Sequence, residues 1–154
     1  MFRSSLKKTL AAVFAGALVC SAAAAPANAQ PASFAFTNRQ GDVGCELLTV
    51  EGVPFVLCRS ERARAQMPGC VDPSHQIPAA TRSGSGAVHT VCWNQGYTAT
   101  PARLAPGGTG SGHGYTVVAD PLGNLHVFDS SWRYVMFAGG TVGATPVGPS
   151  SLSS

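Results

Sequence analysis

The histidines are the residues of this sequence best suited to catalysis, and they stand at positions 75, 89, 113 and 126. Nucleophilic catalysis needs a Ser or Cys, a His and a carboxylate that the fold brings together. His113 stands two residues after Ser111, and His126 stands three residues before Asp129. His113, His126 and Asp129 are therefore the candidates for a hydrolytic site, although no G-x-S-x-G motif precedes a helix. The alternative interpretation of His126 is a half-buried strand residue without a catalytic role.

A metal ion or another cofactor is not expected. The four His and seven acidic residues lack the ligand spacing of a metal site. The Gly-rich run 107–114 lacks the Lys and the following helix of a phosphate-binding loop. We interpret that run as a mobile surface loop.

Aromatic and arginine side chains are the candidates for binding. Trp132 and Tyr97 fall in expected turns or loops, where exposed rings contact carbohydrate or protein. Arg59 and Arg62 stand three residues apart at the start of a short helical segment, so they form a candidate patch for an anion or a partner. The alternative for this pair is a solvated surface in which Glu61 balances the charge.

The N-terminal residues 1–29 predict a secretory signal peptide. Three basic residues come first, the apolar run Leu10–Cys20 follows, and Ala27-Asn28-Ala29 completes a cleavage motif. The apolar run is about half the length that a membrane span needs. We therefore expect cleavage after Ala29, a secreted protein and no transmembrane anchor. Lipidation of Cys20 is the alternative, which the bulky Val19 before it disfavours.

The basic charge of the sequence resides in this leader. The whole chain has a formal charge of +3, whereas residues 30–154 contain seven Arg, seven acidic residues and no Lys. A neutral chain offers no electrostatic argument for binding nucleic acid or anionic membranes, so no nucleic-acid partner is expected. The absence of Lys excludes Schiff-base chemistry.

Four cysteines remain after the leader: Cys45, Cys58, Cys70 and Cys92. An even number in an exported chain indicates disulfides. Sequential pairing closes the shortest loops, so we expect Cys45–Cys58 and Cys70–Cys92, with the other two connectivities open. The absence of a C-x-x-C pair argues against a zinc or redox site.

The expected elements are nearly all strands. Alternation and turn residues predict strands at 34–37, 43–50, 53–59 and 87–93, and a β-meander at 115–119, 124–128 and 132–137. Asp120-Pro121-Leu122-Gly123 fits a type I turn within that meander. Residues 60–66 predict a short helix that Ser60 caps and Pro68 ends, and 68–86 and 94–114 are expected to be loops.

These elements predict a single all-β domain at residues 34–137, a small disulfide-bonded β barrel or sandwich with a C-terminal β-meander. Residues 30–33 are expected to be a disordered lead-in. Residues 138–154 contain Gly, Pro, Ser and Thr with few large apolar residues, and we expect a disordered tail.

Several of these residues resemble a family of small secreted actinobacterial proteins of unknown function. Phe36–Cys45 is similar to the family's opening F-x-(S/T)-P-S-G-N-I-x-C pattern. The later matches are Cys58, Pro68-Gly69-Cys70, Val91-Cys92, Leu104-Ala105-Pro106-Gly107 and Tyr134–Phe137. The resemblance implies sequential disulfides and a β fold, and it implies no activity. The family often carries a third cysteine pair. This chain has Val117 near the first of those places and either His126 or Val127 near the second, which implies an apolar contact in place of a disulfide.

We expect a secreted, non-catalytic binding domain that acts on an extracellular macromolecule or a cell-envelope component. One alternative is a secreted hydrolase, which needs His113, His126 and Asp129 in one cleft. The other is an inhibitor of an extracellular enzyme. It needs an extended, exposed segment between Cys58 and Cys70 or between Cys70 and Cys92.

Overall fold

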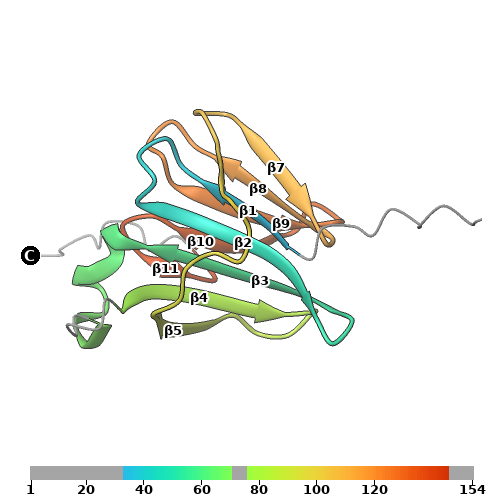
Figure 1. Ribbon diagram of the computed structural model, residues 1–154, viewed down its shortest axis with the longest axis horizontal. Helices are drawn as coiled ribbons and strands as arrows, with labels where there is room; N and C mark the ends of the chain where they lie inside the picture. Colours follow the sequence, from blue (N-terminus) through green and yellow to red (C-terminus); the bar gives the residue numbers. More distant parts are fainter. Residues whose placement is uncertain (1–32, 71–75, 146–154) are drawn as a thin grey trace, which may run out of the picture. The chain divides into compact units, whose positions relative to one another are not determined.

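The computed structural model describes residues 33–70 and 76–145 (Figure 1). The expected signal peptide, residues 1–29, lies outside the described residues, as does most of the expected lead-in. The described residues form two β-sheets. Among these residues, none forms a helix of the length and hydropathy that a membrane crossing requires.

Sheet A contains six strands in the order β5-β4-β3-β2-β1-β6. All neighbours are antiparallel except β1 and β6, which run parallel. The bounds are β1 Ser33–Thr37, β2 Val43–Val50, β3 Val53–Ser60, β4 Ile77–Ser83, β5 His89–Trp93 and β6 Ala102–Arg103.

Sheet B contains five antiparallel strands in the order β11-β10-β9-β8-β7. The bounds are β7 Thr109–Gly112, β8 Tyr115–Ala119, β9 Leu125–Asp129, β10 Tyr134–Ala138 and β11 Val142–Gly143. The expected meander is therefore confirmed, and the two sheets form a sandwich-like all-β fold.

The core lies between the two sheets because each offers one apolar face. Leu47 of β2 and Val56 of β3 are fully buried, and so are Val127 of β9 and Met136 of β10. Burying a side chain of this size contributes roughly 1.5–3 kcal/mol. In β8 and β9 the buried and less buried positions alternate along the strand, so each strand has a second face that points away from the core.

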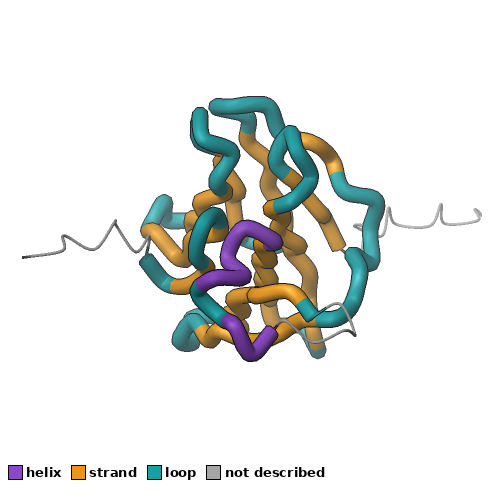
Figure 2. The backbone as a smooth tube through the Cα atoms, turned by 90° about the vertical axis from the view of Figure 1, so that its left-hand side faces the viewer, coloured by secondary structure: helices purple, strands orange, loops and turns teal. Residues whose placement is uncertain are grey.

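Both expected disulfides are present. Cys45 and Cys58 face each other in the β2–β3 register and are bonded in the core. Cys70 belongs to the 3-10 helix η2, Pro68–Cys70, and its bond to Cys92 attaches that helix to β5. Figure 2 shows η2 close to η1, the 3-10 helix Glu61–Ala65. The Ser60 hydroxyl caps η1 by accepting from the Arg62 amide at 3.2 Å.

Two segments expected to be loops contain strands. In the 68–86 segment, Ile77–Ser83 forms β4, which pairs with β3 on one side and β5 on the other. Its sequence has low strand propensity, but Ala79 and Ala80 are fully buried between their neighbours, and tertiary packing overrides propensity in such strands. Pairing with β3 stops at Ala79, so Pro78 needs no amide donor on that side.

The Gly-rich run is also part of a sheet. Residues 109–112 form β7 at the edge of sheet B, although we expected a mobile loop. A Cβ atom at Gly110 would lie 2.2 Å from the Phe36 ring, and one at Gly112 would lie 2.3 Å from the Phe34 ring. These glycines therefore let two phenylalanine rings of β1 pack directly against the β7 backbone.

The fold also extends beyond both expected ends of the domain. Ser33 already pairs with Leu48, so β1 begins inside the expected lead-in. Beyond Phe137, β11 pairs with β10, and Val142 is 2% exposed. The buried Val142 and the pairing of β11 with β10 keep residues 138–145 in the fold. A single valine among Gly, Ser and Thr is too weak a pattern to predict a strand from the sequence.

The register of β8 and β9 provides a test of the fold. Val117 and Val127 are directly opposite and fully buried, which is the apolar contact expected at these positions. Because directly opposite Cβ atoms lie about 4.5–5.5 Å apart, close to what a disulfide needs, the double variant Val117→Cys/Val127→Cys should form a third disulfide. Intact mass after alkylation without reduction should detect no free thiol. The control Val118→Cys/Val127→Cys places its thiols on opposite faces and should be alkylated twice, whereas alkylation of the first variant would contradict the register.

Candidate functional site

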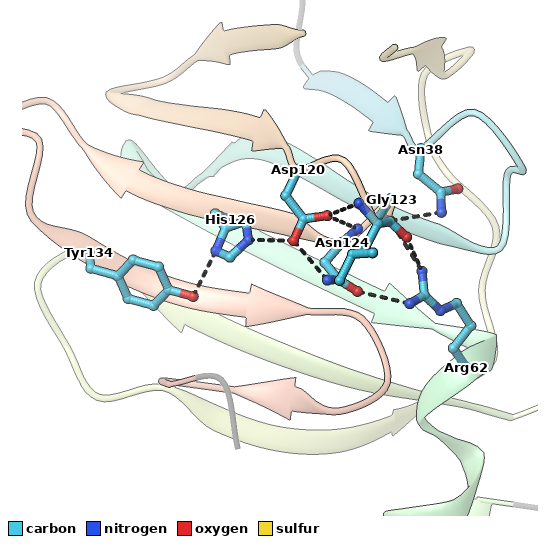
Figure 3. Close-up of polar contacts among 8 residues, drawn as sticks. Asn38, Arg62, Asp120, Gly123, Asn124, His126 and Tyr134 are labelled. Atoms are coloured by element: carbon cyan, nitrogen blue, oxygen red, sulfur yellow. Dashed lines mark hydrogen bonds and ion pairs between the residues drawn. The ribbon is translucent and has the colours of Figure 1, made fainter. Parts of the chain in front are cut away.

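A polar network attaches the β8–β9 turn to the β1–β2 loop and to η1, which connect strands of sheet A (Figure 3). Arg62 donates to the carbonyl oxygens of Leu122 and Gly123 at 3.2 and 3.4 Å, and to Asn124 Oδ1 at 2.9 Å. Asn38, which is fully buried, donates to the same Gly123 carbonyl at 2.8 Å. Arg62, a candidate for a partner patch, is thus engaged in holding the two sheets together.

Asp120 occupies the first position of this turn, and both of its carboxylate oxygens are engaged. Oδ1 accepts from the amides of Leu122 and Asn124 at 2.8 and 2.9 Å, and Oδ2 accepts from Asn124 Nδ2 at 2.8 Å. His126 Nε2 lies 3.1 Å from Oδ2. Burial raises the pKa of Asp120, but the hydrogen bonds from Asn124, His126 and Leu122 together outweigh it and leave the pKa below its ordinary value.

His126 links Asp120 to Tyr134, since its Nδ1 lies 3.3 Å from the Tyr134 hydroxyl. With an ionised Asp120 at Nε2, the neutral imidazole carries its proton on Nε2, and Nδ1 accepts from the phenol. Burial, and then the charge of Asp120, raise the pKa of Tyr134 to about 12. The phenol therefore stays protonated near neutral pH, and Asp120, His126 and Tyr134 form a chain of hydrogen bonds with one another.

His113 and Asp129, the other catalytic candidates, line a cavity of about 220 Å³ at the far ends of β8 and β9. The Ser111 hydroxyl pairs with Thr116 at 2.9 Å, and His113 Nδ1 pairs with the Thr49 hydroxyl at 2.9 Å. The structure thus brings His113 and Asp129 to one cavity, while His126 lies with Asp120 and Tyr134.

Asp129 fixes the β9–β10 turn. Its Oδ1 accepts from the amides of Ser131 and Arg133 at 2.9 and 3.1 Å, and its Oδ2 accepts from Arg133 Nε at 2.9 Å. The backbone hydrogen bond from Arg133, aided by its side chain, lowers the pKa of Asp129. Trp132 sits in this turn with φ of 57°, a left-handed conformation that costs a non-glycine residue roughly 1–2 kcal/mol. The turn holds the indole on the surface, where it is 67% exposed.

Tyr97 and Arg59 hold a loop against sheet A. The Arg59 guanidinium lies 3.8 Å from the centre of the Tyr97 ring, and Arg59 Nη1 donates to the Gln95 carbonyl at 2.7 Å. Glu46, 3% exposed, accepts from the Thr98 amide at 2.8 Å. Burial raises the pKa of Tyr97 despite the nearby Arg59. These two binding candidates therefore serve the packing of the chain.

The outer face of sheet B carries a row of side chains across four strands. The register aligns Ser111 of β7 with Thr116 of β8, Thr116 with Phe128 of β9, and Phe128 with Tyr134 of β10. We call these four residues and Trp132 the aromatic row. The Phe128 ring lies 5.4 Å from Tyr134 and 5.8 Å from Trp132, between centroids. Sequence alternation indicates that His126 and Phe128 share a face, but it does not reveal Tyr134 as their neighbour.

Comparisons with known proteins found no matching family model, no matching curated protein and no matching solved structure. Within the described part of the chain, no three His, Cys, Asp or Glu side chains are grouped in a way that could hold a metal ion.

The first prediction from the site concerns Arg62. Arg62→Gln removes the donors to Leu122, Gly123 and Asn124, so the free energy of unfolding should fall by about 1–2 kcal/mol. Urea denaturation measures this change. Arg103→Gln is the control, because Arg103 is exposed and donates only one bond, of 3.3 Å, to the Arg39 carbonyl among the described residues. Equal losses in the two variants would contradict the role of Arg62.

The second prediction concerns Asp120. Its folded pKa lies below the ordinary value of 3.8, so its contribution to stability is present above that value and is lost as the pH falls through the folded pKa. The stability difference between the native protein and Asp120→Asn should therefore be largest above about pH 5 and shrink below about pH 4. Urea denaturation at pH 2.5, 4 and 6.5 measures it. A difference that does not vary with pH would attribute the loss to packing rather than to ionisation.

Proposed function

We propose that this chain is a secreted, non-catalytic binding domain for a cell-envelope polysaccharide, and that the aromatic row is its binding surface. The observation that carries the proposal is the exposure of aromatic rings on the outer face of sheet B and in the adjoining β9–β10 turn. Trp132 is 67% exposed and Tyr134 is 38% exposed, while Phe128 is half-buried between them.

The chemistry of the row suits a sugar polymer. The C–H groups on one face of a pyranose ring pack against the negative face of an aromatic ring. The hydroxyls of Ser111 and Thr116 extend the row beyond the rings and offer hydrogen bonds to sugar hydroxyls. Because neighbouring strands are about 4.8 Å apart, four strands present roughly 14 Å of surface, a length suited to a short run of sugar units.

The charge of the chain favours a neutral ligand at this surface. Residues 30–154 carry seven Arg and seven acidic residues, so long-range attraction to an anionic polymer is weak. The two charged side chains closest to the row along the chain, Asp129 and Arg133, are paired with each other at 2.9 Å. Stacking and hydrogen bonds must therefore supply the affinity.

The hydrolase alternative has less support. It needs His113, His126 and Asp129 in one cleft, and His126 is engaged elsewhere by Asp120 and Tyr134. The inhibitor alternative needs an extended, exposed segment between cysteines. The described residues between Cys58 and Cys70 include two 3-10 helices, and residues 76–92 contribute β4 and most of β5.

Binding to insoluble peptidoglycan and to an insoluble neutral β-glucan tests the proposal. In a Trp93→Phe background, Trp132 becomes the only tryptophan of the chain and reports contact with soluble fragments. We expect saturable depletion of the protein by at least one of these polymers, and a blue shift of indole emission with its fragments. Trp132→Ala and Tyr134→Ala should each weaken binding at least tenfold.

Leu122→Ala is the matched control, because Leu122 is an apolar side chain that is 75% exposed in the β8–β9 turn. It should bind as the native protein does. Equal affinity of Trp132→Ala and the native protein would remove the aromatic row as the binding surface. Absence of binding to both polymers would contradict the polysaccharide proposal.

A further inference from the structure

The cavity of about 220 Å³ that His113 lines is at one end of the sandwich, where β8 begins at Tyr115 and β9 ends at Asp129. Arg82 of β4 and Gly84, which follows β4, line it on the side of sheet A, and His113 and Arg133 line it from the turns of sheet B. The Tyr115 hydroxyl donates to the Gly84 carbonyl at 2.8 Å and joins the two sheets beside the cavity.

The charge in this cavity is not balanced. Asp129 is the acidic residue among those lining it, and its carboxylate already accepts from the backbone and guanidinium of Arg133. Arg82 is half-buried, and no described carboxylate lies within ion-pair distance of it. Its Nε donates to the Gly86 carbonyl at 2.9 Å, and no described residue accepts from its terminal nitrogens. The hydrogen bond of Nε lies at the exposed surface, and the terminal nitrogens are not among the buried unpaired atoms, so they are accessible to an anion from solvent.

His113 adds a buried ring nitrogen that has no partner among the described residues. Its backbone has φ of 47°, a left-handed conformation that is uncommon for residues other than glycine and clusters at functional sites. Nδ1 pairs with the Thr49 hydroxyl, while Nε2 is buried and has no hydrogen-bond partner among the described residues. Leaving a buried polar atom unpaired costs about 1–3 kcal/mol, so a ligand group that forms a hydrogen bond with Nε2 would be favoured.

We propose that this cavity binds an oxyanion, a carboxylate or phosphate group, with Arg82 as the main charge partner. The forked donors of a guanidinium match the two oxygens of such a group. His113 donates from Nε2 when its Nδ1 accepts the Thr49 hydroxyl, and Arg133 contributes positive charge at the rim, where its side chain is 75% exposed. The site is separate from the aromatic row and does not rest on the polysaccharide proposal.

Nuclear magnetic resonance titration of the mature protein tests this site. Sodium phosphate and sodium acetate are the two probes, each added at constant ionic strength with sodium chloride as the reference. We expect saturable shifts of the Arg82 Nε–Hε and His113 ring signals with at least one probe. Phosphate alone would assign the site to phosphate groups, and acetate alone to carboxylates.

Arg82→Gln should weaken the saturable binding at least tenfold. Arg133→Gln should weaken the saturable binding about threefold. Because Arg133 is exposed, this variant keeps the test valid if Arg82→Gln does not fold. Arg103→Gln removes the same charge from an exposed residue of β6 and should bind as the native protein does. Trp132→Ala should also retain the site, which separates this result from the fate of the aromatic row.

Shifts that stay linear in probe concentration, or that chloride reproduces, would overturn the proposal. Equal loss of binding in Arg82→Gln and Arg103→Gln would do the same, because it would reflect net charge rather than a built site.

Discussion

Asn38 and Arg62 converge on the carbonyl oxygen of Gly123, and the arrangement of the two sheets depends on this contact. Apolar burial draws the sheets together, but it is non-directional and specifies no particular alignment. The hydrogen bonds attach one end of sheet B to sheet A and fix the turn that begins with Asp120. The opposite end is joined by the hydrogen bonds of Tyr115 with Gly84 and of His113 with Thr49, and a cavity remains there.

The distribution of satisfied and unsatisfied polar groups separates structural residues from candidates for function. Asp120, Asp129 and His126 resemble catalytic residues by type, yet their polar atoms are already paired within the chain. A group that must exchange a proton with a substrate needs an open position toward it. Arg82 and the Nε2 atom of His113 lack such partners among the described residues, which makes them better candidates for contact with a ligand.

The strands with strong local signals were predictable from the sequence. The hairpin of β2 and β3, the meander of β8 to β10 and the Ser60 cap are all found where alternation and turn residues place them. β4, β6, β7 and β11 were missed because each owes its form to its neighbours. The alanines of β4 are buried by β3 and β5, the two residues of β6 pair with β1, and the glycines of β7 are covered by Phe34 and Phe36. Local propensity does not encode such partners.

The sequence by itself determined the all-β class and the turn at Asp120, because these depend on residues close together along the chain. It favoured the two shortest-loop disulfides, and the structure decided between them and the other two connectivities. Only the tertiary structure decided which candidate side chains are engaged and which are exposed. Arg59, Arg62 and Tyr97 are occupied by partners more than thirty residues away, whereas Trp132 stays on the surface because the short turn at Asp129 holds it there. Hydrogen bonds between residues so distant in sequence follow from strand order and register, which the residue types alone do not specify.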